Sequence, residues 1–454
     1  MIALTHVCRA WREVFVSRSS LWTDFDCGRL NVDKARIYLE RSKSSPITLH
    51  LYEGDNLPPH HPFPHIVPHA IGRLKFLDAY GTSRSLPDIT AHLTHAAPLL
   101  ENLWIDGNCN SEAQHNPVLT TALFDGDLSL LRELGLQSVR TELPWRNMIN
   151  LTWFFLGQTS PGDVPIGHLL NFLESALRLR KVQFHHVSLT SDSQSGRLVS
   201  LARLERMDII GDDPPSLLLN HLLIPVGAEL NTQSSLHGPL IDDHLPRSLG
   251  NLKNLPGFTD VHLRIGERFS RIRLSGPNGK VTMFPRTSQV DATCLVLDSL
   301  TRFDTSGVKH LKIYRGNSPF SNPFYRALLP MKHLHTLTLS HCTNSDVFVN
   351  VLGPSTSSSA IVVCPKLEEL VLVLRLDGET LNMRNVIEMA EARASRGVKL
   401  KSIGIVNPDE SVQVDTLELM EHVLHVECRP EVDAADEDGD GGEDEYWGRE
   451  YQRS

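Results

Sequence analysis

The sequence predicts an α/β fold made of stacked repeats, with parallel strands on the inside and helices on the outside. Two observations lead to this prediction. A short apolar phrase returns ten times between residues 100 and 405, each time with the same internal spacing. Segments with helical periodicity lie between these phrases. The composition, 41% hydrophobic and 22% charged, is that of a globular protein with a core.

The recurring phrase is L-x-x-L-x-L, with aliphatic or aromatic substitutes. Its ten instances are Leu100/Leu103/Ile105, Leu131/Leu134/Leu136, Leu151/Phe154/Leu156, Leu179/Val182/Phe184, Leu204/Met207/Ile209, Phe258/Val261/Leu263, Val308/Leu311/Ile313, Leu334/Leu337/Leu339, Leu367/Leu370/Leu372 and Leu400/Ile403/Ile405. Such phrases are typical of leucine-rich repeats. We therefore expect a leucine-rich-repeat solenoid over residues 31–428, in which the two later residues of each phrase point into the core.

The spacing between phrases is irregular near the middle of the chain. The intervals that begin at Leu204 and Phe258 are each about two ordinary repeats long. We expect a degenerate strand or an insertion within about 210–300, including a hairpin at 270–284. The segments 166–179 and 382–397 are expected to be helices, the second capped by Asn382 and ended by Gly397.

Residues that alternate with the buried ones would face the concave surface of such a solenoid. The candidate partner-binding residues there are Trp104, Trp153, Phe155, Lys181, His185, Arg206, Arg264 and Lys312. The three aromatic residues are typical interface anchors. Two other interpretations of them stay open: a loop covers them, or the register is shifted by one and they belong to the core. The five basic residues would form a mildly basic strip, or simply scattered solvated charges.

The N-terminal segment carries an apolar stripe at helical spacing, formed by Leu4, Val7, Cys8, Trp11, Val14 and Phe15. Serine residues at 17, 19 and 20 end this helix. Leu21 and Trp22 then add apolar bulk that can fold back on it. On periodicity alone, the helix caps one end of a larger core.

The residues V-C-R-A-W-R at 7–12, followed by S-L-W at 20–22, resemble the C-terminal half of an F-box. The stretch "HVCRAWREVFVSRSSLWTDFDC" is similar to the F-box-like domains common in mushroom-forming fungi, and residues 31–52 resemble the segment that follows them. The L-P-x-E-[IL] segment and first helix that open the family's motif are missing from this chain. The resemblance implies a short all-α F-box remnant at residues 1–30, with adaptor-binding residues Leu4, Val7, Cys8, Trp11, Leu21 and Trp22.

Members of this family are substrate receptors of cullin–RING ubiquitin ligases, in which the F-box docks on a Skp-type adaptor and a separate domain holds the substrate. The resemblance therefore implies a substrate-recognition subunit that binds an unknown protein through the leucine-rich face, with a Skp-type adaptor and a cullin scaffold as partners. The alternative is a leucine-rich-repeat interaction scaffold that does not bind the adaptor.

The charge distribution and the cysteines indicate which kinds of partner and which cellular compartment to expect. The net charge is −10, but residues 431–454 carry ten acidic residues and two arginines, so the remainder is near −2 (−10 minus −8). A nearly neutral body indicates neither nucleic-acid nor membrane binding. The acidic segment 429–454 is expected to be disordered and to aid solubility, or, as a weaker alternative, to rest on the basic strip. Seven dispersed cysteines and no signal peptide indicate a cytoplasmic or nuclear protein.

Motifs that carry catalysis are not found in the sequence. "SGPNGK" at 275–280 lacks the spacing and the Ser/Thr of a phosphate loop. His60, His61, His65 and His69 lie close together, but Pro64 and Pro68 predict a loop rather than a helical metal site. We expect a protein that is not an enzyme and that needs neither a metal nor a cofactor.

Overall fold

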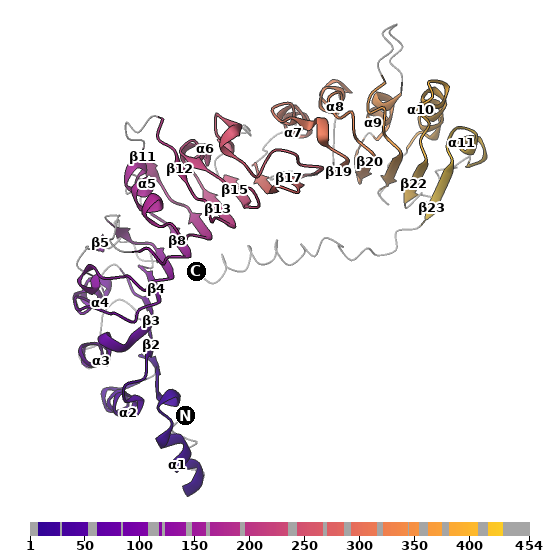
Figure 1. Cartoon of the computed structure of the whole chain (residues 1–454). Helices are drawn as coiled ribbons and strands as arrows, with labels where there is room; N and C mark the ends of the chain where they lie inside the picture. Colours follow the sequence, from indigo (N-terminus) through magenta and orange to yellow (C-terminus); the bar gives the residue numbers. More distant parts are fainter. Residues whose placement is uncertain are drawn as a thin grey trace. The chain divides into compact units, whose positions relative to one another are not determined.

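A computed structural model of the chain describes residues 8–27, 30–52, 61–82, 85–107, 118–119, 123–141, 148–159, 164–190, 196–234, 243–266, 270–285, 292–315, 321–343, 345–353, 362–374, 381–406 and 416–429. The fold is mixed α/β, with extended sheets in which parallel pairing dominates, and helices that accompany them (Figure 1). The chain divides into two compact units. The first holds Met1–Pro256 and Pro277–Arg286, and the second holds Gly257–Gly276 and Thr287–Ser454.

The first unit is built on one parallel sheet. Its strands pair in the order β1 (Asp24–Asp26), β2 (Ile47–Tyr52), β3 (Leu74–Tyr80), β4 (Asn102–Asp106), β6 (Glu133–Gln137), β8 (Trp153–Gly157), β10 (Lys181–His185), β13 (Arg206–Gly211), β15 (Glu229–Ser234) and β18 (Gly279–Phe284). Short parallel pairs join β5 (Val118–Leu119) to β7 (Arg140–Thr141), β9 (Val164–Pro165) to β11 (Leu189–Thr190), and β12 (Val199–Ser200) to β14 (Leu222–Leu223).

Helices line one side of this sheet in Figure 1. They are α2 (Val32–Ser42), α3 (Phe63–Ala70), α4 (Ser85–Ala91), α5 (Ile166–Ser175) and α6 (Ser216–Leu219), and the chain upstream of β1 forms α1 (Arg9–Ser17). Single 3-10 turns are η2 (Ser19–Trp22), η3 (Ile71–Arg73), η4 (Leu123–Gly126) and η6 (Leu249–Asn251).

The second unit repeats the same plan with one antiparallel strand. β17 (Ser270–Gly276) runs antiparallel to β16 (Asp260–Ile265), and parallel pairing then continues through β19 (His310–Tyr314), β20 (Thr336–Ser340), β21 (Glu369–Val373), β22 (Ser402–Val406) and β23 (His425–Arg429). Its helices are α7 (Ala292–Leu300), η7 (Thr305–Gly307), α8 (Ser321–Leu328), α9 (Ser345–Leu352), α10 (Met383–Ser395) and α11 (Thr416–His422). Among the described helices, none has the length and apolar character needed to cross a membrane.

The ten predicted phrases all coincide with strands of these two sheets. In each phrase the two later residues are buried, as for Leu103 and Ile105 in β4 or Leu370 and Leu372 in β21. The parallel register aligns equivalent positions of successive phrases, so that Leu103 of β4 lies beside Leu134 of β6. Every strand thus contributes the same pair of side chains to a continuous core.

Five strands end in the same backbone turn. The residue directly after β6, β8, β10, β19 and β20 has a left-handed conformation, with φ between 52° and 56°, and these residues are Ser138, Gln158, His186, Arg315 and His341. Each donates its N–H to a carbonyl of the next strand along, as from Ser138 to Gly157 at 2.9 Å. Residues other than glycine rarely adopt this conformation. Its recurrence shows that the repeats share a turn as well as a strand.

The irregular middle of the chain holds three strands, β15, β17 and β18, besides the short β14 and the phrase strand β16. β15 fills the first long interval and presents Leu230 and Thr232 to the core. The two arms of the expected hairpin are β17 and β18, of which β17 pairs with β16 and β18 pairs with β15. The boundary between the two units falls in this region.

The N-terminal segment differs from the expectation in two respects. Residues 24–26 form strand β1, which pairs with β2, so the segment 1–30 is not all helical. Helix α1 has no buried residue, and Trp11 and Val14 are more than half exposed, so these two side chains do not cap the core. Trp22 is fully buried instead, with its ring edge-to-face with Tyr38 at 5.0 Å and its indole N–H donating to the Phe15 carbonyl at 2.7 Å.

The proline-rich stretch is a helix, so the prediction of a loop there is wrong. In α3, Pro64 lies in the first turn. An N–H there would have no acceptor carbonyl within the helix, so its absence in proline costs no hydrogen bond. Pro68 lies in the last turn, and the helix ends at Ala70. His65 and His69 are consequently exposed on one face.

The helix predicted at 382–397 is confirmed as α10. The Asn382 side chain accepts a hydrogen bond from the Arg384 N–H at 3.0 Å, and Gly397 follows with φ of 75°. Its best-buried polar residue is Arg393, whose guanidinium donates to the carbonyls of Val363 and Cys364 at 2.9 and 2.8 Å. These bonds fasten α10 to the loop before β21.

Candidate functional site

The candidate site lies on the face of the first sheet that is opposite to the helices. Parallel register aligns two rows of outward side chains across β8, β10, β13, β15 and β18. One row is Trp153, Lys181, Arg206, Glu229 and Lys280, and the next is Phe155, Gln183, Asp208, Asn231 and Thr282. Of the predicted candidates, Trp104, Trp153, Phe155, Lys181, His185 and Arg206 lie on this face.

Aromatic rings gather at one end of the face. The rings of Trp104 and Trp153 stack with centroids 5.5 Å apart and planes 16° apart. Phe155 lies 5.0 Å from Trp104 and 5.0 Å from His185, which it meets edge to face. Both indoles are half-buried, whereas Phe155 is 8% exposed because its neighbours on the same face cover it. Phe154 and Leu156 of the same strand are fully buried, so the alternation along β8 places Trp153 and Phe155 on the opposite face from them.

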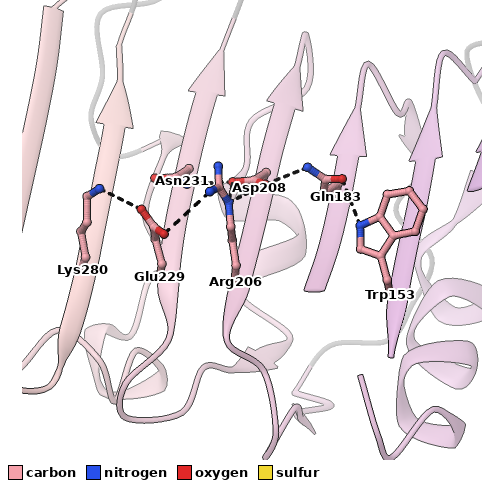
Figure 2. A network of polar contacts seen from close by, with 7 residues as sticks. All are labelled: Trp153, Gln183, Arg206, Asp208, Glu229, Asn231 and Lys280. Atoms are coloured by element: carbon pink, nitrogen blue, oxygen red, sulfur yellow. Dashed lines mark hydrogen bonds and ion pairs between the residues drawn. The ribbon is translucent and has the colours of Figure 1, made fainter. Parts of the chain in front are cut away.

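A buried carboxylate organises the centre of the face. Asp208 is fully buried and accepts hydrogen bonds from Gln183 at 3.0 Å, from Asn231 at 2.7 Å, and from Arg206 Nε at 3.1 and 3.0 Å to its two oxygens. Gln183 in turn accepts from the Trp153 indole N–H at 3.2 Å (Figure 2). The network therefore orients the aromatic cluster through a chain of hydrogen bonds.

The network extends to two further charges on β15 and β18. Glu229 lies 2.9 Å from Lys280 Nζ and 3.9 Å from Arg206 Nη1 (Figure 2). Burial by itself would raise the pKa of the Glu229 carboxyl, but the hydrogen bond and charge of Lys280, with the charge of Arg206, hold that pKa below its ordinary value. In this row Glu229 lies between Arg206 and Lys280, so its charge partly offsets theirs.

The basic strip expected on this face is not basic in the first unit. Arg206 is paired with Asp208 and Glu229. Burial lowers the pKa of His185 to about 4, with an opposing contribution from the charge of Asp208 and a further lowering by His186, so its ring is neutral at pH 7. Lys181 alone among the three candidates is an exposed cation. The pairing of opposite charges was hidden in the sequence because Glu229 and Lys280 lie on strands without a clear phrase.

The other two basic candidates, Arg264 and Lys312, lie in the second unit. There the pairing of β16 with β17 places Arg271 beside Arg264 and Arg273 beside His262. The guanidinium of Arg264 lies 5.5 Å from the ring centre of Tyr314. The sequence reasoning missed Arg271 and Arg273, although the alternation in "SRIRLS" could have identified them.

The candidate adaptor-binding residues fall into three groups. Leu4 and Val7 lie outside the described residues. Cys8 and Trp11 are exposed, and Trp11 stacks on Phe15 with centroids 5.7 Å apart. Leu21 is half-buried and Trp22 is fully buried beneath the guanidinium of Arg41, at 4.3 Å. Of the candidates that the structure describes, Cys8 and Trp11 at the start of α1 are thus the ones open to a partner.

The described part of the chain shows no group of side chains arranged to hold a metal ion. No three His, Cys, Asp or Glu side chains converge there in the way a metal ion requires. His65 and His69 share a helical face, but they have no third ligand among the described residues. What the face of the first sheet offers is aromatic surface, hydrogen-bonding groups and ordered charge, which are the means of molecular recognition.

Comparison with known families finds no family model that matches the chain. Among curated proteins, no sequence matches it either.

Proposed function

We propose that this chain is a leucine-rich-repeat solenoid that binds a protein through the outward face of its first sheet, and that it serves as the substrate-recognition subunit of a cullin–RING ubiquitin ligase. The observation that carries the binding proposal is the cluster of Trp104, Trp153 and Phe155 on that face. Half-exposed aromatic rings held in fixed orientations are the usual anchors of protein interfaces.

The repeat architecture supports the solenoid assignment. The ten phrases coincide with strands, and the left-handed turn recurs at five strand ends. Cys342, two residues after β20, is buried and its thiol lies 3.5 Å from the Ile313 carbonyl. It thus takes the place of the small polar residue that joins neighbouring repeats in leucine-rich arrays.

The receptor role is supported by α1. The resemblance of residues 7–22 to an F-box assigns this helix to the adaptor, and its apolar side chains Trp11, Val14 and Val16 are 54%, 53% and 36% exposed. An amphipathic helix with an uncovered apolar stripe commonly docks into a groove of a partner. Trp22, buried against α2, fastens this helix to the first unit. A cytoplasmic or nuclear location accompanies this role.

Co-precipitation of the full chain with a purified Skp-type adaptor tests the proposal. We expect binding by the native chain and its loss in the double variant Trp11→Ser, Val14→Ser. Both side chains lie on the surface, so the substitutions leave the fold intact. Leu177→Ser is the matched control, because Leu177 is 73% exposed and lies in the same unit. Retained binding in the double variant would contradict the role of α1.

The alternative function is a leucine-rich-repeat scaffold without an adaptor. It predicts that neither the native protein nor the double variant Trp11→Ser, Val14→Ser binds the adaptor. The polar and aromatic face favours both functions equally, so the co-precipitation result decides between them.

A further inference from the structure

A second surface lies on the outward face of β1, β2, β3 and β4, next to the aromatic cluster. We call it the acidic surface. Its outward positions hold four carboxylates together with aromatic rings, and these residues are Asp24, Asp26, His50, Tyr52, Phe76, Asp78, Tyr80 and Asp106. The one lysine or arginine within these four strands, Lys75 on β3, is exposed, and its ammonium lies 3.5 Å from the Glu101 carboxylate. Because Glu101 offsets the charge of Lys75, the four carboxylates leave this surface negatively charged.

Register brings the carboxylates and the rings into contact. Asp26, His50, Asp78 and Trp104 follow one another across the four strands in one row. The hydroxyl of Tyr52 donates to Asp78 at 2.8 Å, and the ring of His50 lies between Asp78 and Asp24, at 3.4 and 3.8 Å. Asp78 and Asp24 are thus held beside aromatic rings.

The rings themselves form a shallow group with exposed faces. His50 is stacked with Tyr52 at 6.3 Å, and Tyr52 lies 6.5 Å from Tyr80. Tyr52 is 52% exposed, so its ring is open to a ligand. A ring face flanked by carboxylates attracts a guanidinium or an ammonium group, through its quadrupole and through charge.

The neighbouring hydroxyls respond to this negative field. Burial, the hydrogen bond to Asp78, and the charges of Asp78 and Asp26 raise the pKa of Tyr52 to about 12. Burial and the charge of Asp106 raise the pKa of Tyr80. Asp78 on β3 and Asp106 on β4 occupy diagonal positions of adjacent strands, where side chains are about 7–8 Å apart, so their charges repel one another and favour a bound cation.

We propose that the acidic surface binds an extended, arginine- and lysine-rich segment of the protein partner. This inference rests on the proposed function, because it names the chemistry of the partner that the same sheet recognises. The adjacent rings of Trp104 and Trp153 would take an apolar side chain that follows the basic segment. A divalent metal is a poorer occupant, since the described carboxylates do not converge into a metal site.

Peptide binding to the full chain tests the inference. The probe is a fluorescent Arg-Ser repeat of about twelve residues, roughly 40 Å when extended, and a Glu-Ser repeat of the same length is its counterpart. Fluorescence anisotropy is recorded at about 50 mM and about 300 mM salt. We expect the Arg-Ser peptide to bind, more weakly at the higher salt, and the Glu-Ser peptide not to bind.

Variants locate the peptide on the chain. The double variant Asp78→Asn, Asp106→Asn should weaken binding by about tenfold, because two neighbouring charges are lost without a change in shape. Tyr52→Ser should weaken it several-fold, whereas Tyr52→Phe keeps the ring and most of the affinity. Asp88→Asn is the matched control, since Asp88 is an exposed acid of the same unit on helix α4. Circular dichroism verifies that each variant is folded.

Two outcomes would overturn the inference. The native chain could fail to bind the Arg-Ser peptide, or binding could persist in the aspartate double variant and so belong to another acidic segment such as 431–445. Neither outcome affects adaptor co-precipitation, which depends on α1. A chain that captures the adaptor but not the basic peptide would keep the receptor role and lose this inference.

Discussion

The indole of Trp104 on β4 lies over Gly135 of β6, in the space that a Cβ atom would occupy there. A Cβ built on Gly135 would overlap ring carbons of Trp104, which could not give way without leaving its stack on Trp153. Trp104 and Gly135 are direct register partners on the neighbouring strands β4 and β6. The glycine is therefore required by the aromatic cluster, not by its own backbone conformation.

Substitution Gly135→Ala should displace Trp104 and destabilise the first unit by about 1–3 kcal/mol, as overpacked sites usually do. Tryptophan fluorescence during urea unfolding measures this, because five of the six tryptophans belong to the first unit: Trp11, Trp22, Trp104, Trp145 and Trp153. Gly72→Ala is the control: Gly72 belongs to the same unit, and nothing lies within 4 Å of a Cβ built there. An unchanged stability and emission spectrum in Gly135→Ala would refute the requirement.

Substitution Asp208→Ala should cost about 2–4 kcal/mol of unfolding free energy. The change leaves the donors of Gln183, Asn231 and Arg206 without their shared acceptor in a buried place. It should also loosen Trp153, which is held through Gln183. The measurement is urea unfolding with the fluorescence signal of the first unit.

Asp212→Ala serves as the comparison for Asp208→Ala, since Asp212 is an exposed acid just beyond the same strand. An effect within about 0.5 kcal/mol is expected there. Equal effects of the two substitutions would show that the network contributes nothing specific.

The stability of the first unit should fall between pH 6.5 and pH 4. Burial lowers the pKa of His244 to about 4, and its Nδ1 lies 3.1 Å from the Thr232 hydroxyl. Below pH 6.5 the unfolded chain takes up a proton that the folded chain refuses, so stability is lost as the pH falls until about 4. The shift of about 2.5 pH units corresponds to about 3 kcal/mol at most. Carboxylates such as Glu229 act at lower pH, because their folded pKa values are depressed.

The variant His244→Gln tests this pH dependence, since glutamine keeps a hydrogen-bonding group and does not titrate. Its urea midpoints at pH 7.5 and pH 5 should differ less than those of the native chain. His168→Gln, an exposed histidine on α5, should retain the native profile. A profile in His244→Gln as steep as the native one would be evidence against the assignment.

Substitution Arg393→Lys should destabilise the second unit by about 2 kcal/mol or more. A single ammonium cannot replace the planar guanidinium that reaches the carbonyls of Val363 and Cys364 from one buried position. Hydrogen exchange of the amides in α10 and β21 measures the local effect. Arg396→Lys, at the exposed end of the same helix, is the control. Equal exchange in both variants would contradict a structural role for Arg393.

Local pattern was enough to identify the ten phrase strands and the outward face of the first sheet. The phrase L-x-x-L-x-L fixes which side chains are buried, and strand alternation then assigns Trp104, Trp153 and Phe155 to the opposite face. The helix at 382–397 was predictable for the same reason, since its cap and its stop are encoded by neighbouring residues. Whether the aromatic residues were core or surface stayed open, because a register shift of one residue exchanges the two faces.

The arrangement of charge was decided by tertiary structure. Asp208 and Arg206 are two residues apart, but Glu229 and Lys280 are 51 positions apart and meet only because β15 and β18 pair in parallel. The same is true of the acidic surface, in which Asp26, Asp78 and Asp106 come from strands far apart in the chain. Helix α3 forms despite its prolines because Pro64 lies in the first helical turn, and the composition of the segment does not reveal that position.

The sequence by itself thus determined the periodic elements, because a strand or a helix is recognised by spacings of a few residues. Tertiary structure alone determined which charges cancel and which accumulate. That outcome depends on the register of strands that are separated by tens of residues, and no local pattern records it.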